Sequence, residues 1–327
     1  MRRKPVSDWK EKTDTACLLG DWANQYLDFA GAKYSDKTYR EKKAMFKRFF
    51  KSVDAKKPVS SLTSKQVLNF VVQQHKERSG YAANKDRKNL VAAWNWGTKY
   101  LDPPLTGLNP CLVEKMPEVR RPRYVPPEDD FWAIYKVAEG QDRVMLLTLL
   151  YLAARRGEVF ALTWSDVDFV NSRVRLKTRK RRDGTLEYDV LPMIQELREA
   201  LRWWWEHRPI KDSPYVFLCL DKHELTKEHY GKPFQYRLCF MKRLCEKASV
   251  ERFGFHAIRH LSATILYNNG VDVSVIQAIL RHKSATTTDG YLRTLGLEAL
   301  RKPLEKGFSK PVSGEVIPFE EKQKKSG

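Results

Sequence analysis

Apolar residues recur at helical spacing through the first hundred positions of the chain. One stripe has intervals of four, four and three residues, which places its members on one helix face: Leu18, Trp22, Tyr26 and Phe29. A second stripe follows a candidate cap at Ser35 or Asp36 and consists of Phe46, Phe49 and Val53. Both stripes predict amphipathic helices whose aromatic residues form a core rather than a ligand site.

Two further helices are predicted before residue 102. Thr63 is followed three residues later by Gln66, a capping-box pattern that marks the beginning of a helix. The apolar residues of this third helix are Val67, Phe70 and Val71. A fourth helix runs to Leu101, carries lysine and arginine on its other faces, and contains Leu90, Val91 and Trp94. The sequence therefore predicts an all-helical N-terminal module with a basic exterior.

Proline and arginine dominate a short segment after this module. Its prolines prevent a continuous helix or central strand: Pro117, Pro122, Pro126 and Pro127. The arginines among them are Arg120, Arg121 and Arg123. We interpret residues 117–127 as a semi-extended basic linker, suited either to lying along DNA or to plain contact with solvent.

The periodicity is mixed after the linker. Residues 131–137 and 144–154 have the pattern of helices, and residues 162–164, 173–178 and 186–191 have that of short strands, the last two closing over a turn at Asp183 and Gly184. From Ile194 onward the pattern is mostly helical. One of three successive tryptophans there should be exposed, because a single core cannot cover Trp203, Trp204 and Trp205. The predicted fold class is mainly α with a small antiparallel β-sheet.

Length and charge narrow the class of protein. The chain has 327 residues, which favours two domains over one. Its 60 lysines and arginines outnumber 40 acidic residues, and the net charge of +20 favours a polyanionic partner. The 5 cysteines are scattered without a C-x-x-C pair, which predicts reduced thiols in the cytoplasm. The apolar stretches are too short for a membrane span, and the basic N-terminus lacks the apolar run of a signal peptide.

Four separated clusters combine residues that suit phosphate chemistry. They are residues 155–158, a basic hairpin over residues 173–182, residues 256–260, and His282 with Tyr291 nine residues later. A phosphodiester under attack develops negative charge, which cationic side chains stabilise, and the fork of arginine matches two phosphate oxygens at once. A free tyrosine has a pKa near ~10, so it needs cationic or basic neighbours to act as a nucleophile. A hairpin lysine could then protonate the departing 5′-oxygen, and nothing in this scheme requires a metal or a nucleotide.

These clusters resemble the motifs of the tyrosine recombinase family, which includes phage integrases and chromosome-dimer resolvases. Residues 155–158 are similar to the family's first arginine motif, and residues 164–166 to the tryptophan-x-aspartate that follows it. Residues 256–260 match the histidine-x-x-arginine motif. The resemblance implies Glu158 and His260 as supporting residues and the following as catalytic residues: Arg155, His256, Arg259, His282 and Tyr291.

The hairpin offers two candidates for the catalytic lysine. Counting from Trp164, the family's lysine falls near Lys180, whereas Lys177 precedes a threonine, as the family's lysine commonly does. We favour Lys180 as the acid, with Lys177 as the alternative. The residues assigned to DNA contacts are Lys177, Arg179 and Arg181 of the hairpin and Arg120, Arg121 and Arg123 of the linker.

The chain departs from the family's usual pattern at several positions. Ala153 and Ala154 stand where the family has glycine and a larger apolar residue. Ala257 stands where aspartate is frequent, and Arg281 stands where glycine is common. None of these changes removes a candidate catalytic group.

The resemblance also implies an architecture and partners. Residues 1–116 are similar to a helical, SAM-like core-binding domain and residues 128–308 to the catalytic domain, and residues 309–327 form a basic tail expected to be flexible. The two domains would clamp double-stranded DNA at specific core sites, within a homo-oligomer expected to be a tetramer. An accessory DNA-bending protein or a directionality factor would be a further partner. A short apolar stripe that could dock on a neighbouring protomer consists of Leu297, Leu300, Leu304 and Phe308.

The expected function is site-specific recombination through a 3′-phosphotyrosyl intermediate, without metal, ATP or other cofactor, in the cytoplasm at the nucleoid. An integrase of a phage or another mobile element is favoured. The alternatives are a chromosome-dimer resolvase, a type IB topoisomerase, a catalytically inactive DNA-binding relative and a metal-dependent nuclease. His256 and His260 have the spacing of zinc ligands, but Ala257 stands where a zinc protease has glutamate, so no metal site is expected.

Overall fold

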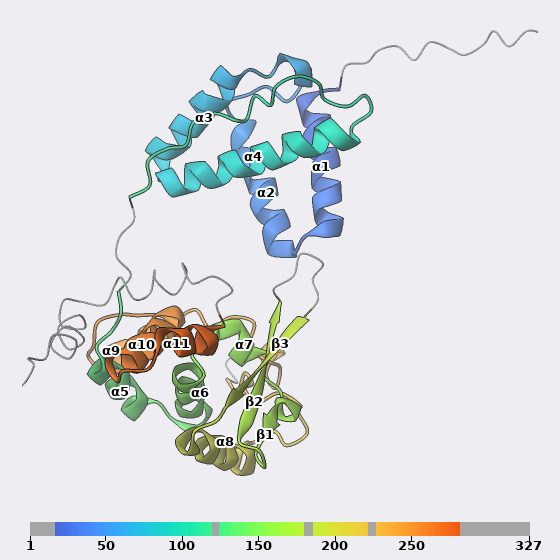
Figure 1. Cartoon of the computed structure of the whole chain (residues 1–327). Coiled ribbons are helices and arrows are strands. Elements are labelled where there is room, and N and C mark those ends of the chain that lie inside the picture. Colours follow the sequence, from blue (N-terminus) through green and yellow to red (C-terminus); the bar gives the residue numbers. More distant parts are fainter. Residues whose placement is uncertain (1–16, 120–123, 180–185, 222–226, 282–327) are drawn as a thin grey trace, which may run out of the picture. The chain divides into compact units, whose positions relative to one another are not determined.

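The computed structural model describes residues 17–119, 124–179, 186–221 and 227–281 (Figure 1). The chain divides between Arg121 and Pro122 into two compact units. This division falls inside the segment rich in proline and arginine. Each unit has its own hydrophobic core, so each is described by itself.

The described part of the N-terminal unit is built from α1 (Leu19–Lys33), α2 (Asp36–Phe49), α3 (Ser64–Glu77) and α4 (Gly80–Tyr100), with a short 3-10 helix, η1 (Val59–Ser61). The long helix α4 packs on the other three α-helices. The ring of Trp22 packs edge-on against Phe46 and Trp94, which joins α1, α2 and α4 in one core. Aromatic residues of the predicted stripes therefore form this core.

The beginning of α3 follows the sequence prediction. Thr63 N donates to Gln66 Oε1 at 2.9 Å, and the Thr63 hydroxyl accepts from Gln66 N at 3.3 Å, which completes the capping box. Buried Asp86 on α4 accepts from Arg48 Nη2 at 2.6 Å and from Arg78 Nη1 at 2.9 Å. This carboxylate fastens α4 to α2 and to the end of α3.

Helix α6 (Gly140–Tyr151) is the central element of the C-terminal unit. Its residues 144–150 are all buried, as expected of a helix that is covered on every side. The helices that pack on it are α5 (Glu128–Val137), α7 (Arg156–Phe160), α8 (Gln195–His207) and α10 (Phe255–Asn268). Two further helices belong to the described part of this unit: α9 (Phe240–Lys247) contacts α5, and α11 (Val273–Leu280) contacts α10.

A three-stranded antiparallel sheet of order β1-β2-β3 belongs to the same unit. Its strands are β1 (Val167–Asp168), β2 (Arg173–Arg179) and β3 (Leu186–Pro192). Val174 and Leu176 of β2 are buried, while Arg173 and Arg175, which alternate with them, are exposed, which is the alternation of a sheet with one covered face. The fold class is therefore mainly α with a small antiparallel β-sheet, as predicted.

Two differences from the sequence prediction affect the surroundings of Arg155. Residues 162–164 are not a strand: Thr163 makes only an isolated bridge with Tyr215, and Trp164–Asp166 form the 3-10 helix η2. The cause is Asp166, whose carboxylate accepts from Thr163 N at 3.2 Å and closes a tight turn. Helix α6 ends at Tyr151 rather than at residue 154, because Ala153 has a left-handed φ of 42°.

The region after residue 194 also departs from the prediction. Helix α8 ends at His207, and among the described residues between α8 and α9 only Lys227–His229 (η3) form a helix. Two tryptophans of α8, rather than one, are partly exposed: Trp203 at 45% and Trp205 at 42%. Trp204 is buried and donates to Val216 O at 2.7 Å, so one indole alone serves the core.

Candidate active site

The turn between α6 and α7 positions Arg155. The left-handed backbone at Ala153 lets the chain turn so that Arg155 becomes the N-cap residue of α7. Glu158 accepts from Arg155 N at 2.8 Å and from Arg155 Nη1 at 2.8 Å. The Glu158 side chain is 3% exposed and that of Arg155 is 37% exposed. A buried carboxylate thus anchors a guanidinium group that solvent and substrate can still reach.

Arg259 lies deep in the same region. Its side chain comes from α10 and belongs to the largest fully buried side chains of the described residues. Its Nη1 donates to Ala153 O in the α6–α7 turn, and its Nη2 donates to Leu280 O at the end of α11. The two carbonyls bring Arg259 beside the segment that holds Arg155, although the motifs are far apart in the chain.

His256 and His260 lie one turn apart on α10. Their rings are perpendicular, with centroids 4.9 Å apart. His260 is buried, whereas His256 is exposed and lines a cleft of about 690 Å³ together with Arg155 and Arg156. His256 is therefore the histidine of this pair that a substrate can contact, and His260 supports it from within.

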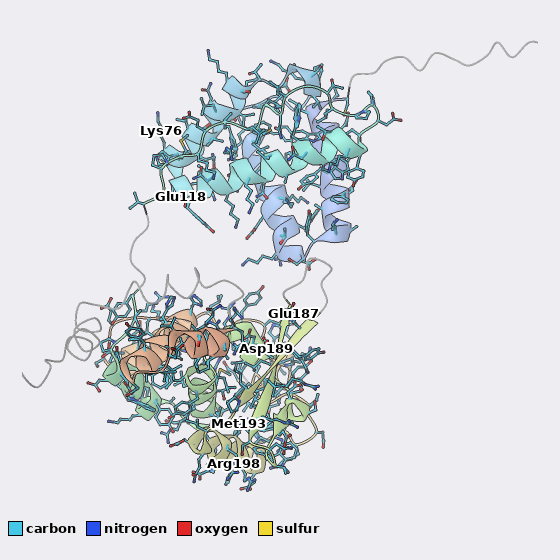
Figure 2. The ribbon with its side chains drawn as sticks, viewed as in Figure 1. Lys76, Glu118, Glu187, Asp189, Met193 and Arg198 are labelled. Atoms are coloured by element: carbon cyan, nitrogen blue, oxygen red, sulfur yellow. The ribbon has the colours of Figure 1, made fainter. Side chains whose placement is uncertain are left out.

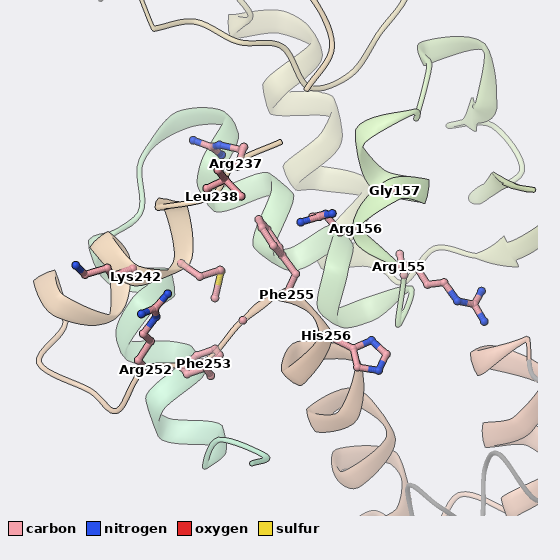
Figure 3. A pocket seen from close by; sticks show the side chains of 13 residues that line it. Arg155, Arg156, Gly157, Arg237, Leu238, Lys242, Arg252, Phe253, Phe255 and His256 are labelled. Carbon is pink, nitrogen blue, oxygen red and sulfur yellow. The ribbon is translucent and has the colours of Figure 1, made fainter. Parts of the chain in front are cut away.

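Positive charge lines this cleft. In the view of Figure 3, Arg155 and His256 lie toward one side and Lys242 and Arg252 toward the other. Arg156 also lines it, so cationic groups surround the space in which a ligand would sit. Such a lining suits a polyanion, because each lysine or arginine can neutralise one phosphate.

The hairpin residue Lys177 is engaged with a buried carboxylate. Its Nζ lies 2.7 Å from Asp166 Oδ2 and donates to Thr163 Oγ1 at 3.2 Å. Arg175 Nε donates to Asp166 Oδ1 at 2.9 Å, and the Asp166 side chain is 0% exposed. Burial would raise the pKa of Asp166, but the hydrogen bonds from Lys177, Thr163 and Arg175 lower it below its usual value. In this structure Lys177 fastens β2 to the η2 turn.

Several predicted site residues lie outside the described part of the chain. Arg179 belongs to β2, where its backbone pairs with Leu186, but its side chain is not described. The residues outside the described ranges are Lys180, His282 and Tyr291 of the catalytic set, and Arg120, Arg121, Arg123 and Arg181 of the DNA contacts. The structure brings together Arg155, Glu158, His256, Arg259 and His260.

Sequence reasoning missed two contributions to this site. The carbonyls of Ala153 and Leu280 hold Arg259, and backbone atoms leave no mark in a residue pattern. Arg281, noted only as a departure from the family's pattern, donates to Glu158 Oε2 at 2.7 Å across 123 positions of sequence. No pattern of neighbouring residues predicts this contact. The one indication in the sequence is that Arg281, a charged residue, stands where glycine is common.

Metal and membrane features can be judged for the described residues. Within those ranges, no three histidine, cysteine, aspartate or glutamate side chains are grouped closely enough to hold a metal ion. In the same part of the chain, no helix combines the length and apolar character that crossing a membrane requires. All five cysteines are free, as their scattered positions predict.

The arrangement has a clear chemical capacity. Arg155, His256 and Arg259 place two guanidinium groups and an imidazole in one region, and buried partners or backbone carbonyls hold the two arginines in place. Preorganised cationic donors of this kind stabilise negative charge that develops on phosphate oxygens. The geometry therefore suits attack on a phosphodiester.

Comparison with known sequences agrees with this chemistry. The model of the phage integrase family matches residues 127–296. The tyrosine recombinase XerA of Thermococcus onnurineus is 32% identical over 166 residues, which are 51% of this chain and 55% of that relative. The chain thus spans about half the length of the curated relatives that it matches.

Solved structures share the fold over most of the chain. The Tn1549 transposon integrase in complex with circular intermediate DNA has a TM-score of 0.67 at 18% identity, covering 89% of this chain and 100% of that chain. A lambda integrase tetramer bound to a Holliday junction has a TM-score of 0.64 at 20% identity, covering 85% and 78%. At such identities the likeness establishes the fold.

Proposed function

Because the chain belongs to the phage integrase family, we propose that it is a site-specific DNA recombinase that cuts and rejoins DNA through Tyr291. The observation that carries the proposal is the meeting of Arg155 and Arg259 at the α6–α7 turn. Arg155 is exposed enough to donate to a scissile phosphate, and buried Arg259 adds a second fixed positive charge close by. This is what attack by a tyrosine oxygen requires.

The proposed reaction exchanges one phosphodiester for another. The Tyr291 hydroxyl gives its proton to a basic neighbour, for which His256 is the candidate, and its oxygen attacks the phosphorus to form a 3′-phosphotyrosyl bond. The bond to the 5′-oxygen breaks, and that oxygen takes a proton from Lys180. Arg155, Arg259, His256 and His282 stabilise the charge on the non-bridging oxygens. The 5′-hydroxyl of a second strand then reverses the step. Since the phosphotyrosine conserves the bond energy, the cycle needs neither ATP nor a metal ion.

The proposed substrate is double-stranded DNA with specific core sites, bound by both units of the chain. The basic cleft beside Arg155 and the arginine-rich hairpin support this, and the net charge of +20 adds long-range attraction. We assign recombination to a homotetramer on DNA, as in the lambda integrase assembly, with the C-terminal leucines linking protomers. The reaction would take place in the cytoplasm at the nucleoid.

Within the family, we favour an integrase of a phage or another mobile element. The relatives include both a XerA recombinase and a transposon integrase, so the chromosome-dimer resolvase is the second candidate. Direct repeats on both sides of the gene would support the element, whereas their absence beside a chromosomal dimer-resolution site would support the resolvase. An integrase of this kind would also use a directionality factor or a DNA-bending protein.

The test is the covalent adduct. A DNA site selected from random sequence is rebuilt as a nicked suicide substrate, from which the cleaved end is lost and the adduct accumulates. Wild type should form a protein–DNA adduct that resists denaturation and persists in EDTA. Tyr291→Phe should bind the site with unchanged affinity and form none. An adduct at normal yield in the variant would exclude Tyr291 as nucleophile, and sensitivity to EDTA would favour a metal-dependent nuclease.

A further inference from the structure

Arg281 has a left-handed backbone conformation, which disfavours any residue with a side chain such as arginine. It follows the last residue of α11 with φ of 53° and ψ of 45°, the left-handed conformation in which glycine is the usual residue. A side chain there is disfavoured relative to glycine, because its Cβ lies too close to the following carbonyl oxygen. The Arg281 side chain is also 3% exposed, so a charged group is buried at a strained position. Both costs indicate that its contacts compensate for them.

The contacts of Arg281 satisfy most of its guanidinium group. Its Nη2 donates to Glu158 Oε2 at 2.7 Å, and its Nη1 donates to Leu152 O at 3.1 Å and to Ile279 O at 3.0 Å. Its Nε lies 3.7 Å from Oδ2 of Asp189 on β3, and Figure 2 labels Asp189. One side chain thereby connects the end of α11 to the α6–α7 turn and to the hairpin.

The partner of Arg281 is the carboxylate that holds Arg155. Glu158 Oε1 accepts from Arg155 Nη1, and Glu158 Oε2 accepts from both Arg155 N and Arg281 Nη2. Glu158 is buried to the same degree as Arg281, at 3% exposed. A buried carboxylate needs more than one donor to stay ionised and in a single rotamer. Arg281 supplies a buried side-chain donor, whereas the side chain of Arg155 is partly exposed.

From these contacts we infer that Arg281 is a positioning residue for strand cleavage: it holds Glu158, and through Glu158 it fixes the direction of the Arg155 guanidinium group. The inference deepens the proposed function and rests on it. Because Arg281 also reaches Asp189, movement of the hairpin or of α11 would reach Arg155 through the same side chain. Arg281 itself does not contact the reacting phosphate in this assignment.

The main variant is Arg281→Gly in the full chain, because glycine fits the left-handed backbone and keeps the turn intact. Ser249→Gly is the matched control, since Ser249 has φ of 55° at an exposed position and does not line the cleft. Arg281→Lys keeps the charge but loses the fork. We expect Arg281→Gly to keep its DNA affinity within about threefold and to form the adduct about 10- to 100-fold more slowly, because a misdirected catalytic group costs that much. Arg281→Lys should be intermediate, and Ser249→Gly should match wild type.

A double-mutant cycle tests the route through Glu158. If Arg281 acts through that carboxylate, Arg281→Gly should slow adduct formation little further when Glu158→Gln is already present. Added guanidinium ion should restore part of the rate of Arg281→Gly and none of the rate of Ser249→Gly or wild type. Three outcomes would each overturn the positioning role. The two substitutions could slow adduct formation by factors that multiply, Arg281→Gly could leave the rate unchanged, or Arg281→Gly could lower DNA affinity as much as it lowers the rate.

The same cycle measured on unfolding of the DNA-free protein separates this inference from the proposed function. If wild type forms no adduct, the recombinase proposal fails, and the unfolding cycle still decides whether Glu158 and Arg281 are coupled. Coupling of the two substitutions in the unfolding free energy would support the contact between Glu158 and Arg281. Additive effects on the unfolding free energy would refute this contact, whether or not the protein cleaves DNA.

Discussion

At the scale of single residues, the two candidate arginines are held by different means. Arg155 has a carboxylate partner and is 37% exposed, whereas Arg259 is buried and donates to the carbonyls of Ala153 and Leu280. A carboxylate partner fixes one side of a guanidinium group, and carbonyl dipoles fix a buried cation without neutralising it. Arg259 therefore keeps its positive charge beside the segment that holds Arg155.

The contacts of Lys177 predict that the two hairpin lysines, Lys177 and Lys180, have different roles. Lys177→Ala should lower the unfolding free energy by about 1–3 kcal/mol, because the buried Asp166 loses a donor. Cleavage should continue in this variant. Lys180→Ala should bind DNA but cleave slowly, and a substrate with a bridging 5′-phosphorothiolate should restore its rate, since a thiolate leaves without a proton. The reverse pattern, with rescue of Lys177→Ala, would assign the acid to Lys177.

At the scale of elements, patterns of neighbouring residues predicted the helices and strands well, whereas contacts between residues far apart in the chain were not predicted. The capping box at Thr63 and the β2–β3 pairing were predicted because each depends on residues close in the chain. The strand predicted for residues 162–164 was wrong because the carboxylate of Asp166 outweighs a short apolar pattern. The motifs predicted that Arg155, Glu158 and Arg259 would meet. The role of Arg281 depends on a partner 123 residues away, which periodicity cannot reveal.

Asp166 also gives the hairpin a predictable response to pH. The pKa of Asp166 is lower in the folded state than in the unfolded state, where it is near ~3.9. Its contribution to stability is therefore complete above the pKa of the unfolded state and is lost as the pH falls through the pKa of the folded state. Asp166→Asn should therefore lose about 1–3 kcal/mol at neutral pH. Calorimetry at pH 7 and at pH 3 should find the gap between variant and wild type smaller at pH 3. A gap that stays constant over this range would show that folding does not lower the pKa of Asp166.

At the scale of the whole molecule, the excess of positive charge governs DNA affinity. The logarithm of the binding constant should fall with the logarithm of salt concentration by about 0.9 per neutralised phosphate. For ten contacts the affinity should fall by about five decades between 50 and 200 mM salt, which filter binding or anisotropy can measure. Replacing Arg252 and Lys242 of the cleft by glutamine should flatten the slope. A flat response of wild type would contradict extensive phosphate contact.

Assembly on DNA should depend on the apolar stripe beyond Tyr291. Charged substitutions at Leu300 and Leu304 should leave binding to a single core site nearly unchanged, since neither residue belongs to the cationic set. Synapsis and strand exchange should fail, because an apolar segment that docks on a neighbour cannot bury a charge without a large cost. Gel-shift assays with one and two sites separate the outcomes: loss of single-site binding would place the stripe on its own protomer.

The packing of α11 has a consequence for the order in which the site forms. Ile276 and Leu280 of this helix are buried in a small cluster with Ala153 and Ala263, apart from the large core around α6. An element with so little buried apolar surface opens by local unfolding at a lower free energy than the core. Backbone amides of α11 should therefore exchange with deuterium well before those of α6, and equal protection would contradict this. Each opening withdraws Leu280 O from Arg259, so the DNA-free protein should alternate between an assembled and a dismantled phosphate site, and bound DNA should slow the exchange of α11.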